Sequence, residues 1–327
     1  MRNKASTVQV LDISQKYTGF KGFLHEMSKN KVLYLMMLPT IIFLIINNYL
    51  PMLGLSMTFV RFNPAKGLLG SPWVGLENLK FFFNTNDFFT ITRNTVCYNV
   101  VFIVLDISVA AFCAIAINEL RNKRTGRVYQ AFLLISFFLS WVVINYIFFA
   151  FMSVDRGFIN NSILAPLGIE PVRWYSKEAG PYWPFILVFA QLWRYTGYNT
   201  ILLYSGLMGI DKQYYEAALI DGASKWKQIR YVTLPLLSPV IIAMFLMLIG
   251  RVFYADFGLH YQVTNNSVAI LNWTDVLDTY VYRALRGSNS NLSLAAAAGF
   301  YQAVVGMIIV YVANRVIRRF DPEKSLF

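Results

Sequence analysis

Residues 211–235 read DKQYYEAALIDGASKWKQIRYVTLP, a polar and strongly helix-forming stretch between two long apolar segments. Asp211 is suited to cap a helix that runs from about Lys212 to Ile220. Asp221 and Gly222 then break this helix, because glycine accepts the positive φ that a sharp turn needs. The stretch is therefore predicted to begin with a short helix that ends in a glycine turn.

A second short helix follows the turn, starting at Ser224 or Asp221, and Leu234 and Pro235 end the stretch and begin the next apolar segment. The result is a helix-turn-helix that lies along a membrane surface. Two interpretations fit this pattern alone: an amphipathic connector that rests at the interface, or a docking element for another protein.

Six apolar segments surround this stretch, each long enough to cross a bilayer, for which about 20 mostly apolar residues are needed. Only Asp106 and Arg194 are charged within them. They are Val32–Val60, Asn94–Asn118, Val128–Val154, Ala179–Ile210, Tyr231–Gly250 and Asn291–Asn314. Four prolines should mark kinks or helix starts: Pro39, Pro51, Pro235 and Pro239. We predict an all-α membrane protein with six transmembrane helices.

The composition agrees with a chain dissolved largely in lipid, since 57% of its 327 residues are hydrophobic and only 14% are charged. Its formal net charge of +12 does not indicate nucleic-acid binding, because the basic residues lie between apolar runs and form no patch. Of the 29 lysines and arginines, 18 fall on one side of the predicted bilayer and 9 on the other. Because cytoplasmic loops are enriched in these residues, both termini and the 211–235 stretch are predicted to be cytoplasmic.

This topology divides the chain into five regions. They are a cytoplasmic N-terminal tail (1–31), a first transmembrane helix (32–60), an extracytoplasmic loop (61–93), a five-helix core (94–314) and a cytoplasmic C-terminal tail (315–327). The 211–235 stretch lies inside the core.

Catalytic and metal-binding patterns are absent from the sequence. Cys97 and Cys113 lie in one apolar segment, too far apart along a helix for a disulfide. His25 and His260 stand without the neighbouring ligands of a zinc site, so no metal site is expected. No glycine is followed by lysine, which excludes the GxxxxGK phosphate loop and predicts that any ATP hydrolysis belongs to a separate subunit.

Polar side chains inside spans are costly and tend to line a pathway or the bundle interior. Asp106, Asn145 and Gln191 are such residues, although Asp106 could equally pair with an arginine to lock helices. The candidates for contact with a ligand in such a pathway combine aromatic faces with hydrogen-bonding groups. They form one group of Trp193, Arg194, Tyr195, Tyr198 and Asn199, and a second of Arg251, Tyr254 and Asp256. An interfacial aromatic girdle and snorkelling arginines are the alternative explanation.

The 211–235 stretch resembles the EAA loop of binding-protein-dependent ABC importer permeases, and Val232 stands where that pattern usually has isoleucine. The matching residues are Glu216, Ala217, Ala218, Asp221, Gly222, Ala223, Leu234 and Pro235. Further segments look like the LplB-like branch of the maltose-type sugar permeases. These are SPWVGLENLKFFF, RNTVCYNVV, GYNTILLYSGLMGID, TDVLDTYVYRAL and RRFDPEKSLF.

The resemblance implies the MetI-like fold of an ABC type I importer permease and the import of a carbohydrate into bacteria across the plasma membrane. It implies four kinds of partner: the lipid bilayer, a second homologous permease, two ATPase subunits that hold ATP and Mg²⁺, and an extracytoplasmic solute-binding protein. It also makes the matching residues the contact with the ATPase.

Two other classes of protein are alternatives, and each predicts its own sequence pattern. An ion-gradient-driven secondary transporter predicts inverted repeats and intramembrane ion ligands. A membrane enzyme such as a lipid-linked glycosyltransferase needs a cluster of acidic or histidine residues at one interface, for which Asp275 and Asp278 are the nearest approach.

Overall fold

The computed structural model describes residues 29–120, 122–286 and 291–320, which fold into helices joined by loops, with no named strand among them. His25 lies outside the described residues. The chain separates into two units, Met1–Ser56 and Met57–Phe327. The predicted all-α class is thereby confirmed for the described part of the chain.

The N-terminal helical segment runs from Lys31 to Phe59 and is apolar throughout its length. Pro39 lies inside α2 without a change of helix type, whereas a π-helical turn directly precedes the short helix that contains Pro51. Proline lacks the N–H that an α-helical ladder requires, which explains why the hydrogen-bond spacing adjusts there. Its elements are α2 (Lys31–Leu44), η1 (Ile45–Tyr49), α3 (Leu50–Met52) and η2 (Leu53–Phe59).

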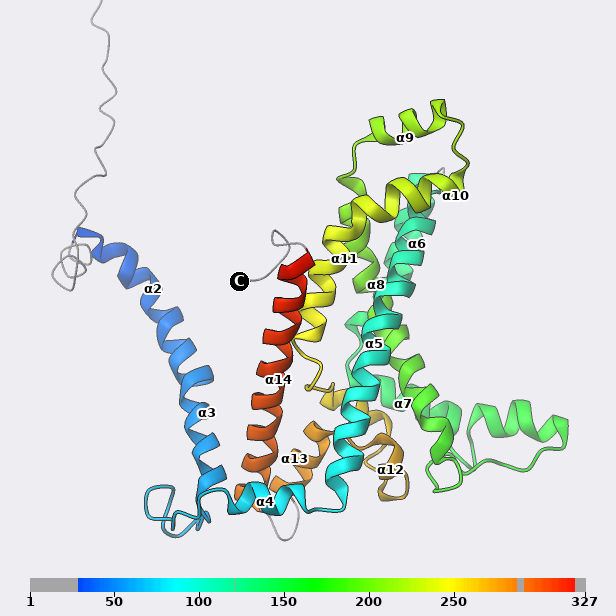
Figure 1. The fold of residues 1–327 in the computed structure, drawn as a ribbon. Helices are drawn as coiled ribbons and strands as arrows, with labels where there is room; N and C mark the ends of the chain where they lie inside the picture. Colours follow the sequence, from blue (N-terminus) through cyan, green and yellow to red (C-terminus); the bar gives the residue numbers. More distant parts are fainter. Residues whose placement is uncertain (1–28, 121, 287–290, 321–327) are drawn as a thin grey trace, which may run out of the picture. The chain divides into compact units, whose positions relative to one another are not determined.

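In the second unit the long helices α5 and α8 pack along each other, α6 and α11 pack against both of them, and α14 packs against α11 (Figure 1). The backbones of α6 and α8 touch, because a Cβ added at Gly197 would lie 2.1 Å from the carbonyl oxygen of Leu133. The main helices are α5 (Asp87–Asn118), α6 (Lys123–Ile135), α7 (Trp141–Met152), α8 (Trp183–Met208), α11 (Leu234–Ile249) and α14 (Leu292–Phe320).

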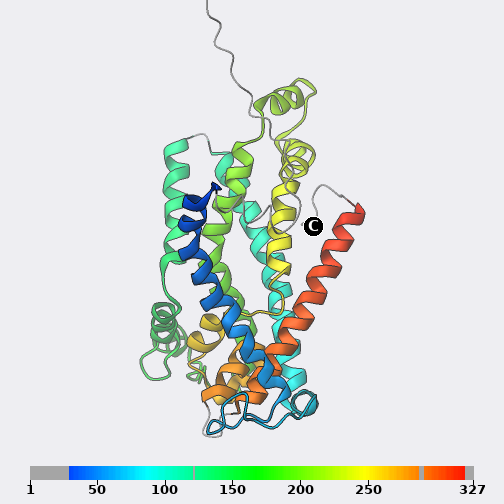
Figure 2. The same ribbon diagram turned by 90° about the vertical axis from the view of Figure 1, so that its left-hand side faces the viewer.

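Short elements occupy the two ends of this bundle. Figures 1 and 2 place α9 and α10 beyond one end, whereas α4, α12 and α13 lie at the other end. The bounds are α4 (Glu77–Phe83), α9 (Lys212–Ile220), α10 (Lys225–Gln228), α12 (Leu271–Thr274) and α13 (Leu277–Arg286). The remaining turns are η3 (Ser136–Phe138), η4 (Ile159–Leu164), η5 (Ala165–Leu167), η6 (Gly180–Tyr182), η7 (Ile229–Thr233), η8 (Leu259–Val263) and η9 (Val268–Ile270).

The described residues do not directly confirm all six predicted spans. Among the described residues, four single helices are long and apolar enough to cross a membrane, and a bent pair raises this to as many as five. Helix α8 lies within the predicted segment 179–210 but carries many polar residues and falls outside that criterion. The four single spans are Lys31–Phe59, Asp87–Asn118, Lys225–Ile249 and Leu292–Arg319.

The expectation of one continuous helix over Val128–Val154 is wrong. Two helical pieces, Lys123–Phe138 and Trp141–Met152, meet at an angle of 96°. Ser140 adopts an extended conformation at the break and its hydroxyl accepts a hydrogen bond from the N–H of Val143, which starts a new helix.

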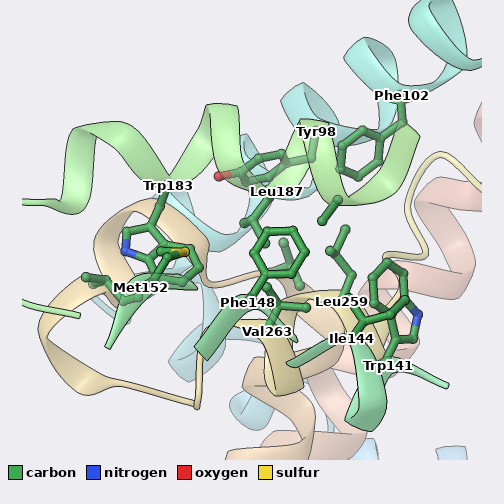
Figure 3. Packing of buried hydrophobic residues seen from close by; sticks show 13 residues of the cluster. Tyr98, Phe102, Trp141, Ile144, Phe148, Met152, Trp183, Leu187, Leu259 and Val263 are labelled. Carbon is green, nitrogen blue, oxygen red and sulfur yellow. The ribbon is translucent and has the colours of Figure 1, made fainter. Parts of the chain in front are cut away.

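An aromatic and aliphatic cluster fills the space between α5, α7, α8 and η8 (Figure 3). Trp183 and Leu187 from α8, Ile144 from α7 and Leu259 from η8 are completely buried. Because burial of a large apolar side chain contributes about 1.5–3 kcal/mol, this cluster is a principal stabiliser of the packing between these four elements.

Polar side chains near the start of α5 bind the irregular segment that follows α11. Asn94 donates to the carbonyl of Asp275 at 3.0 Å, Tyr98 to that of Trp273 at 2.7 Å, and Asn99 to that of Val252 at 2.9 Å. These bonds satisfy carbonyl groups at the ends and breaks of short helices.

His260 adds a further polar contact inside the same segment. Burial lowers the pKa of His260 to about 4, so its ring is neutral at pH 7. Nδ1 lies 2.9 Å from the carbonyl oxygen of Thr274, which can only accept, so Nδ1 is the protonated nitrogen.

A buried ion pair joins Asp275 to Arg283 on α13. The two side chains are 5% and 25% exposed, and both guanidinium Nη atoms bond the carboxylate, with Nη1 2.8 Å from Oδ1. The hydroxyl of Thr279 donates to the same Oδ1 at 2.6 Å.

Removal of the arginine is expected to destabilise this end of the protein. Arg283→Ala leaves a buried, uncompensated carboxylate and should cost about 3 kcal/mol, which is measurable as a fall in the melting temperature in detergent. Arg61→Ala is the matched control, because the Arg61–Glu77 pair is 69% and 59% exposed and should contribute less than about 1 kcal/mol. Equal melting temperatures for the two variants would contradict this assignment.

Candidate functional site

The 211–235 stretch forms the predicted helix-turn-helix, which we call the coupling loop. Its first helix, α9, spans Lys212–Ile220 and begins at Asp211, whose side chain accepts a hydrogen bond from the N–H of Gln213 at 3.0 Å. Gly222 has a φ of +74°. The start, length and end of this helix therefore agree with the signals in the sequence.

The turn after α9 is a Schellman motif, in which two N–H groups bond back to carbonyls in the last turn of a helix. Gly222 N–H donates to the carbonyl of Leu219 at 3.0 Å, and Ala223 N–H donates to that of Ala218 at 2.9 Å. Ser224 precedes α10 in an extended conformation but makes no side-chain capping bond. The left-handed glycine thus fixes the angle between the two short helices.

Three contacts stabilise the coupling loop, and one of them joins it to the rest of the unit. Tyr215 and Thr233 place their hydroxyl oxygens 3.1 Å apart, which joins α9 to η7. Lys225 on α10 makes an ion pair of 2.9 Å with Glu119 at the end of α5. Inside the loop, the side-chain amide of Gln228 donates to the carbonyl of Ala223 at 3.0 Å.

Large apolar side chains on the coupling loop are exposed. Ile220 is 87% exposed and Trp226 is 70% exposed, and Tyr214 and Leu219 are also exposed. Glu216 lies on the surface beside them. A cluster of exposed apolar groups at the end of a bundle is typical of a protein interaction surface.

A second candidate site is a cavity of about 460 Å³, which we call the inner cavity. It is lined by α5, α8, the end of α11 and the segment that follows α11, all within the second unit. Its polar lining residues are Asn99, Asp106, Gln191, Tyr195, Tyr198, Asn199, Arg251, Tyr254 and Asp256. Aromatic rings beside amide, carboxylate and guanidinium groups suit a ligand with both apolar and hydroxyl-bearing surfaces.

Asp256 organises one wall of the inner cavity. Its Oδ2 accepts from the indole of Trp141 at 2.8 Å and from the hydroxyl of Tyr195 at 2.9 Å. Its Oδ1 accepts from the N–H groups of Gly258 at 2.9 Å and Leu259 at 3.3 Å. Four donors satisfy this carboxylate, so it orients its neighbours and has little capacity left for a ligand.

The structure brings together six of the eight residues predicted to contact a sugar. Tyr195, Tyr198, Asn199, Arg251, Tyr254 and Asp256 all line the inner cavity. Trp193 instead lies in an apolar groove with Phe185 and Phe189, and Arg194 stacks over the ring of Trp141 at 4.4 Å. Trp193 and Arg194 therefore lie outside the lining of the inner cavity.

Asn99 is a lining residue that the sequence interpretation missed. It lies seven positions before Asp106 on α5, which places both on one helix face. The residues Gln191, Tyr195 and Tyr198 on α8 share a face for the same reason. Helical periodicity, applied to polar residues within the spans, was the signal that could have identified this set.

The sequence of this chain matches a known protein family and is similar to two characterised relatives. Residues 106–325 match the family model described as "Binding-protein-dependent transport system inner membrane component". Protein LplB of Bacillus subtilis (strain 168) is 33% identical over 94% of this chain and 95% of its own length. The polygalacturonan/rhamnogalacturonan transport system permease protein YteP of the same organism is 32% identical over 93% and 92%.

Two solved structures share the fold. A bacterial ABC transporter involved in the import of the acidic polysaccharide alginate superposes with a TM-score of 0.81 at 27% identity, covering 91% of this chain and 99% of the other. A bacterial alginate ABC transporter in complex with an alginate pentasaccharide-bound periplasmic protein gives a TM-score of 0.80 at 26% identity, covering 90% and 97%.

The left-handed turn at Gly222 generates a prediction about the coupling loop. Gly222→Val forces a β-branched residue into positive φ, whereas Gly222→Asn keeps a residue that tolerates it, and nothing lies within 4 Å of an added Cβ. Spin labels introduced at exposed Gln213 and Lys227, with Cys97 and Cys113 replaced by alanine, should show a broadened distance distribution only in the valine variant. A valine variant with an unchanged distribution would refute the role of the turn.

Proposed function

The chain belongs to the binding-protein-dependent transport system inner membrane components, so it is a permease subunit of an ABC importer and not an enzyme, and we propose that it carries a carbohydrate. The MetI-like fold is shared with the alginate transporters. The remaining questions concern the cargo, the partners and the residues that serve each of them.

Relatives and cavity chemistry both support a carbohydrate cargo. YteP is named for polygalacturonan and rhamnogalacturonan transport, and the structural neighbours import alginate. In this chain the inner cavity combines tyrosine rings with amide groups. Sugars present C–H faces that suit aromatic rings and hydroxyl groups that suit amides, so an oligosaccharide or polysaccharide fragment is the cargo that we propose.

The coupling loop is the proposed contact with the ATPase subunit. Its EAA-like residues are Glu216, Ala217, Ala218, Asp221, Gly222, Ala223, Leu234 and Pro235. The exposed side chains of Ile220 and Trp226 supply an apolar surface that a partner cleft would cover. One observation carries the proposal: the coupling loop is exposed, and the chain belongs to this family.

The complete importer would contain this chain, a second homologous permease, two ATPase subunits that bind ATP and Mg²⁺, and an extracytoplasmic solute-binding protein. Support for the last partner comes from the alginate transporter, which was solved with a periplasmic protein bound. The proposed docking surface for it is the end of the bundle opposite the coupling loop, where α4, α12 and α13 lie (Figure 1).

The proposed topology places the coupling loop and both termini in the bacterial cytoplasm. The distribution of lysine and arginine supports it. It retains the cytoplasmic tails 1–31 and 315–327, the first transmembrane helix 32–60, the extracytoplasmic loop 61–93 and the core 94–314 as working boundaries.

In the proposed mechanism, this chain transmits a movement of the ATPase to the inner cavity. Differential contacts in two states drive alternating access. Displacement of α9 and α10 is passed to α8 and α11, which adjoin the coupling loop in the chain and line the inner cavity. The cavity would then open first to the side of the binding protein and afterwards to the cytoplasm.

Reversal of the charge at Glu216 tests the coupling assignment. Glu216→Lys should leave membrane insertion and melting temperature unchanged, since the side chain is exposed and makes no ion pair among the described residues. Copurification of the ATPase and ATP-dependent sugar uptake by proteoliposomes should both be lost. Lys123→Ala, a change at an exposed cation outside the coupling loop, is the control.

Uptake by the same proteoliposomes tests which oligosaccharide is the cargo. Uptake is measured with maltotetraose, a neutral oligosaccharide, and with tetragalacturonate, an acidic one, each presented with the solute-binding protein of the importer. Normal ATP-driven uptake by the Glu216→Lys complex would overturn the coupling assignment, and uptake of neither oligosaccharide would count against the carbohydrate proposal.

A further inference from the structure

Ten buried side-chain atoms have no hydrogen-bond partner within the described part of the chain, and two of them, both acceptor oxygens, belong to residues that line the inner cavity. These two oxygens are Oδ1 of Asp106 on α5 and Oε1 of Gln191 on α8. The two side chains meet across the helix pair, where Nε2 of Gln191 donates to Oδ2 of Asp106 at 3.3 Å. This single bond uses one acceptor of the pair and leaves the other two bare.

A buried acceptor atom that lacks a hydrogen-bond donor destabilises the folded protein. An unsatisfied buried polar group costs roughly 1–3 kcal/mol, and more when it is charged. Asp106 is 2% exposed and lies near the middle of the long apolar helix α5. It makes no ion pair with any cation among the residues that the structure describes. Side chains in this condition within spans mark ligand pathways.

Both residues line the inner cavity, which also supplies the remaining groups of a binding site. Tyr198 and Tyr254 are 41% and 43% exposed and offer ring faces. Arg251, which is exposed, offers a guanidinium donor to the same space. The cavity therefore has acceptors at its floor, with aromatic and cationic groups that are more accessible.

We propose that Asp106 and Gln191 together form a subsite for the hydroxyl groups of one sugar unit of the cargo, an inference that rests on the proposed carbohydrate function. Neighbouring hydroxyls on a pyranose ring are donors spaced to reach two adjacent acceptors. A hydroxyl that donates to a carboxylate makes a charge-assisted bond, which is stronger than a bond between neutral groups.

Two comparisons within the chain favour hydroxyl donors over other partners. Asp256, the other carboxylate of the cavity, accepts four donors from the protein, so the bare acceptors of Asp106 and Gln191 are not the general condition of this cavity. A metal cation is disfavoured, because the guanidinium of Arg251 lines the same 460 Å³ and would repel it. A uronate carboxylate would be repelled at Asp106 itself, so the subsite is expected to bind the hydroxyl edge of a sugar even in an acidic glycan.

Asp106→Asn tests the subsite with minimal change of shape. An asparagine keeps the size of the side chain and can still bond Gln191, so the melting temperature should be unchanged. Uptake of maltotetraose or tetragalacturonate, whichever the wild-type importer transports, should fall about tenfold at saturating binding protein, since a hydrogen bond to a charged group is lost. Cys113→Ser, two turns further along α5 and outside the lining of the cavity, should transport normally.

A thiol-labelling experiment distinguishes a role of Asp106 in this subsite from a role in helix packing alone. In a background with Cys97 and Cys113 replaced by alanine, a thiol introduced by Asp106→Cys should react with the water-soluble reagent 2-sulfonatoethyl methanethiosulfonate. The transported oligosaccharide should slow that reaction. A residue that only packs helices would be unreactive.

Three results would overturn the subsite: unchanged uptake by Asp106→Asn, an unreactive thiol at position 106, or uptake that requires sodium and loses this requirement in Asp106→Asn, which would indicate a cation site. If the wild type transports neither oligosaccharide, the carbohydrate proposal fails. If the wild type does transport one of them and any of the three results above is obtained, the subsite alone fails.

Discussion

Polar groups that are withdrawn from water must bond to one another, and the first turns of α5 are where this chain meets that requirement most fully. Asn94, Tyr98 and Asn99 bond carbonyls of the segment that follows α11, and Thr95 accepts the N–H of Leu277 at 2.9 Å. Irregular backbone that is buried away from water is tolerated only where other protein groups satisfy its hydrogen bonds. The position of Asp256, and of the cavity wall that it organises, depends on these bonds.

Local chemistry explains why the coupling loop could be predicted from the sequence. The capping side chain of Asp211 acts within two residues, and the left-handed turn at Gly222 acts within four. Leu234 and Pro235 likewise open α11 through the preference of proline for the first turn of a helix. Because each signal is complete within one helical turn, no knowledge of the tertiary structure was needed to place α9.

Features that depend on packing between helices could not be predicted from such local signals. The bend at Ser140 has neither proline nor glycine to announce it, and the polar face of α8 is a property of its contacts with α5. Trp193 and Arg194 looked as sugar-like as Tyr195, yet Trp193 lies in an apolar groove and Arg194 stacks over Trp141, and neither lines the inner cavity. Residue type identified the cluster, whereas only the three-dimensional arrangement separated lining residues from their sequence neighbours.

Transmission between the coupling loop and the inner cavity has to use the stiffest connection available. The Lys225–Glu119 pair links the loop to α5, but the two side chains are 69% and 34% exposed, and such a pair contributes at most about 1 kcal/mol. The coupling loop is also covalently continuous with α8 at one end and with α11, through η7, at the other. Gln191 and Tyr195 on α8 and Arg251 just after α11 lie in the cavity wall. A movement of the loop therefore reaches the cavity along two helices, with the ion pair and the Tyr215–Thr233 contact serving to fix its starting position.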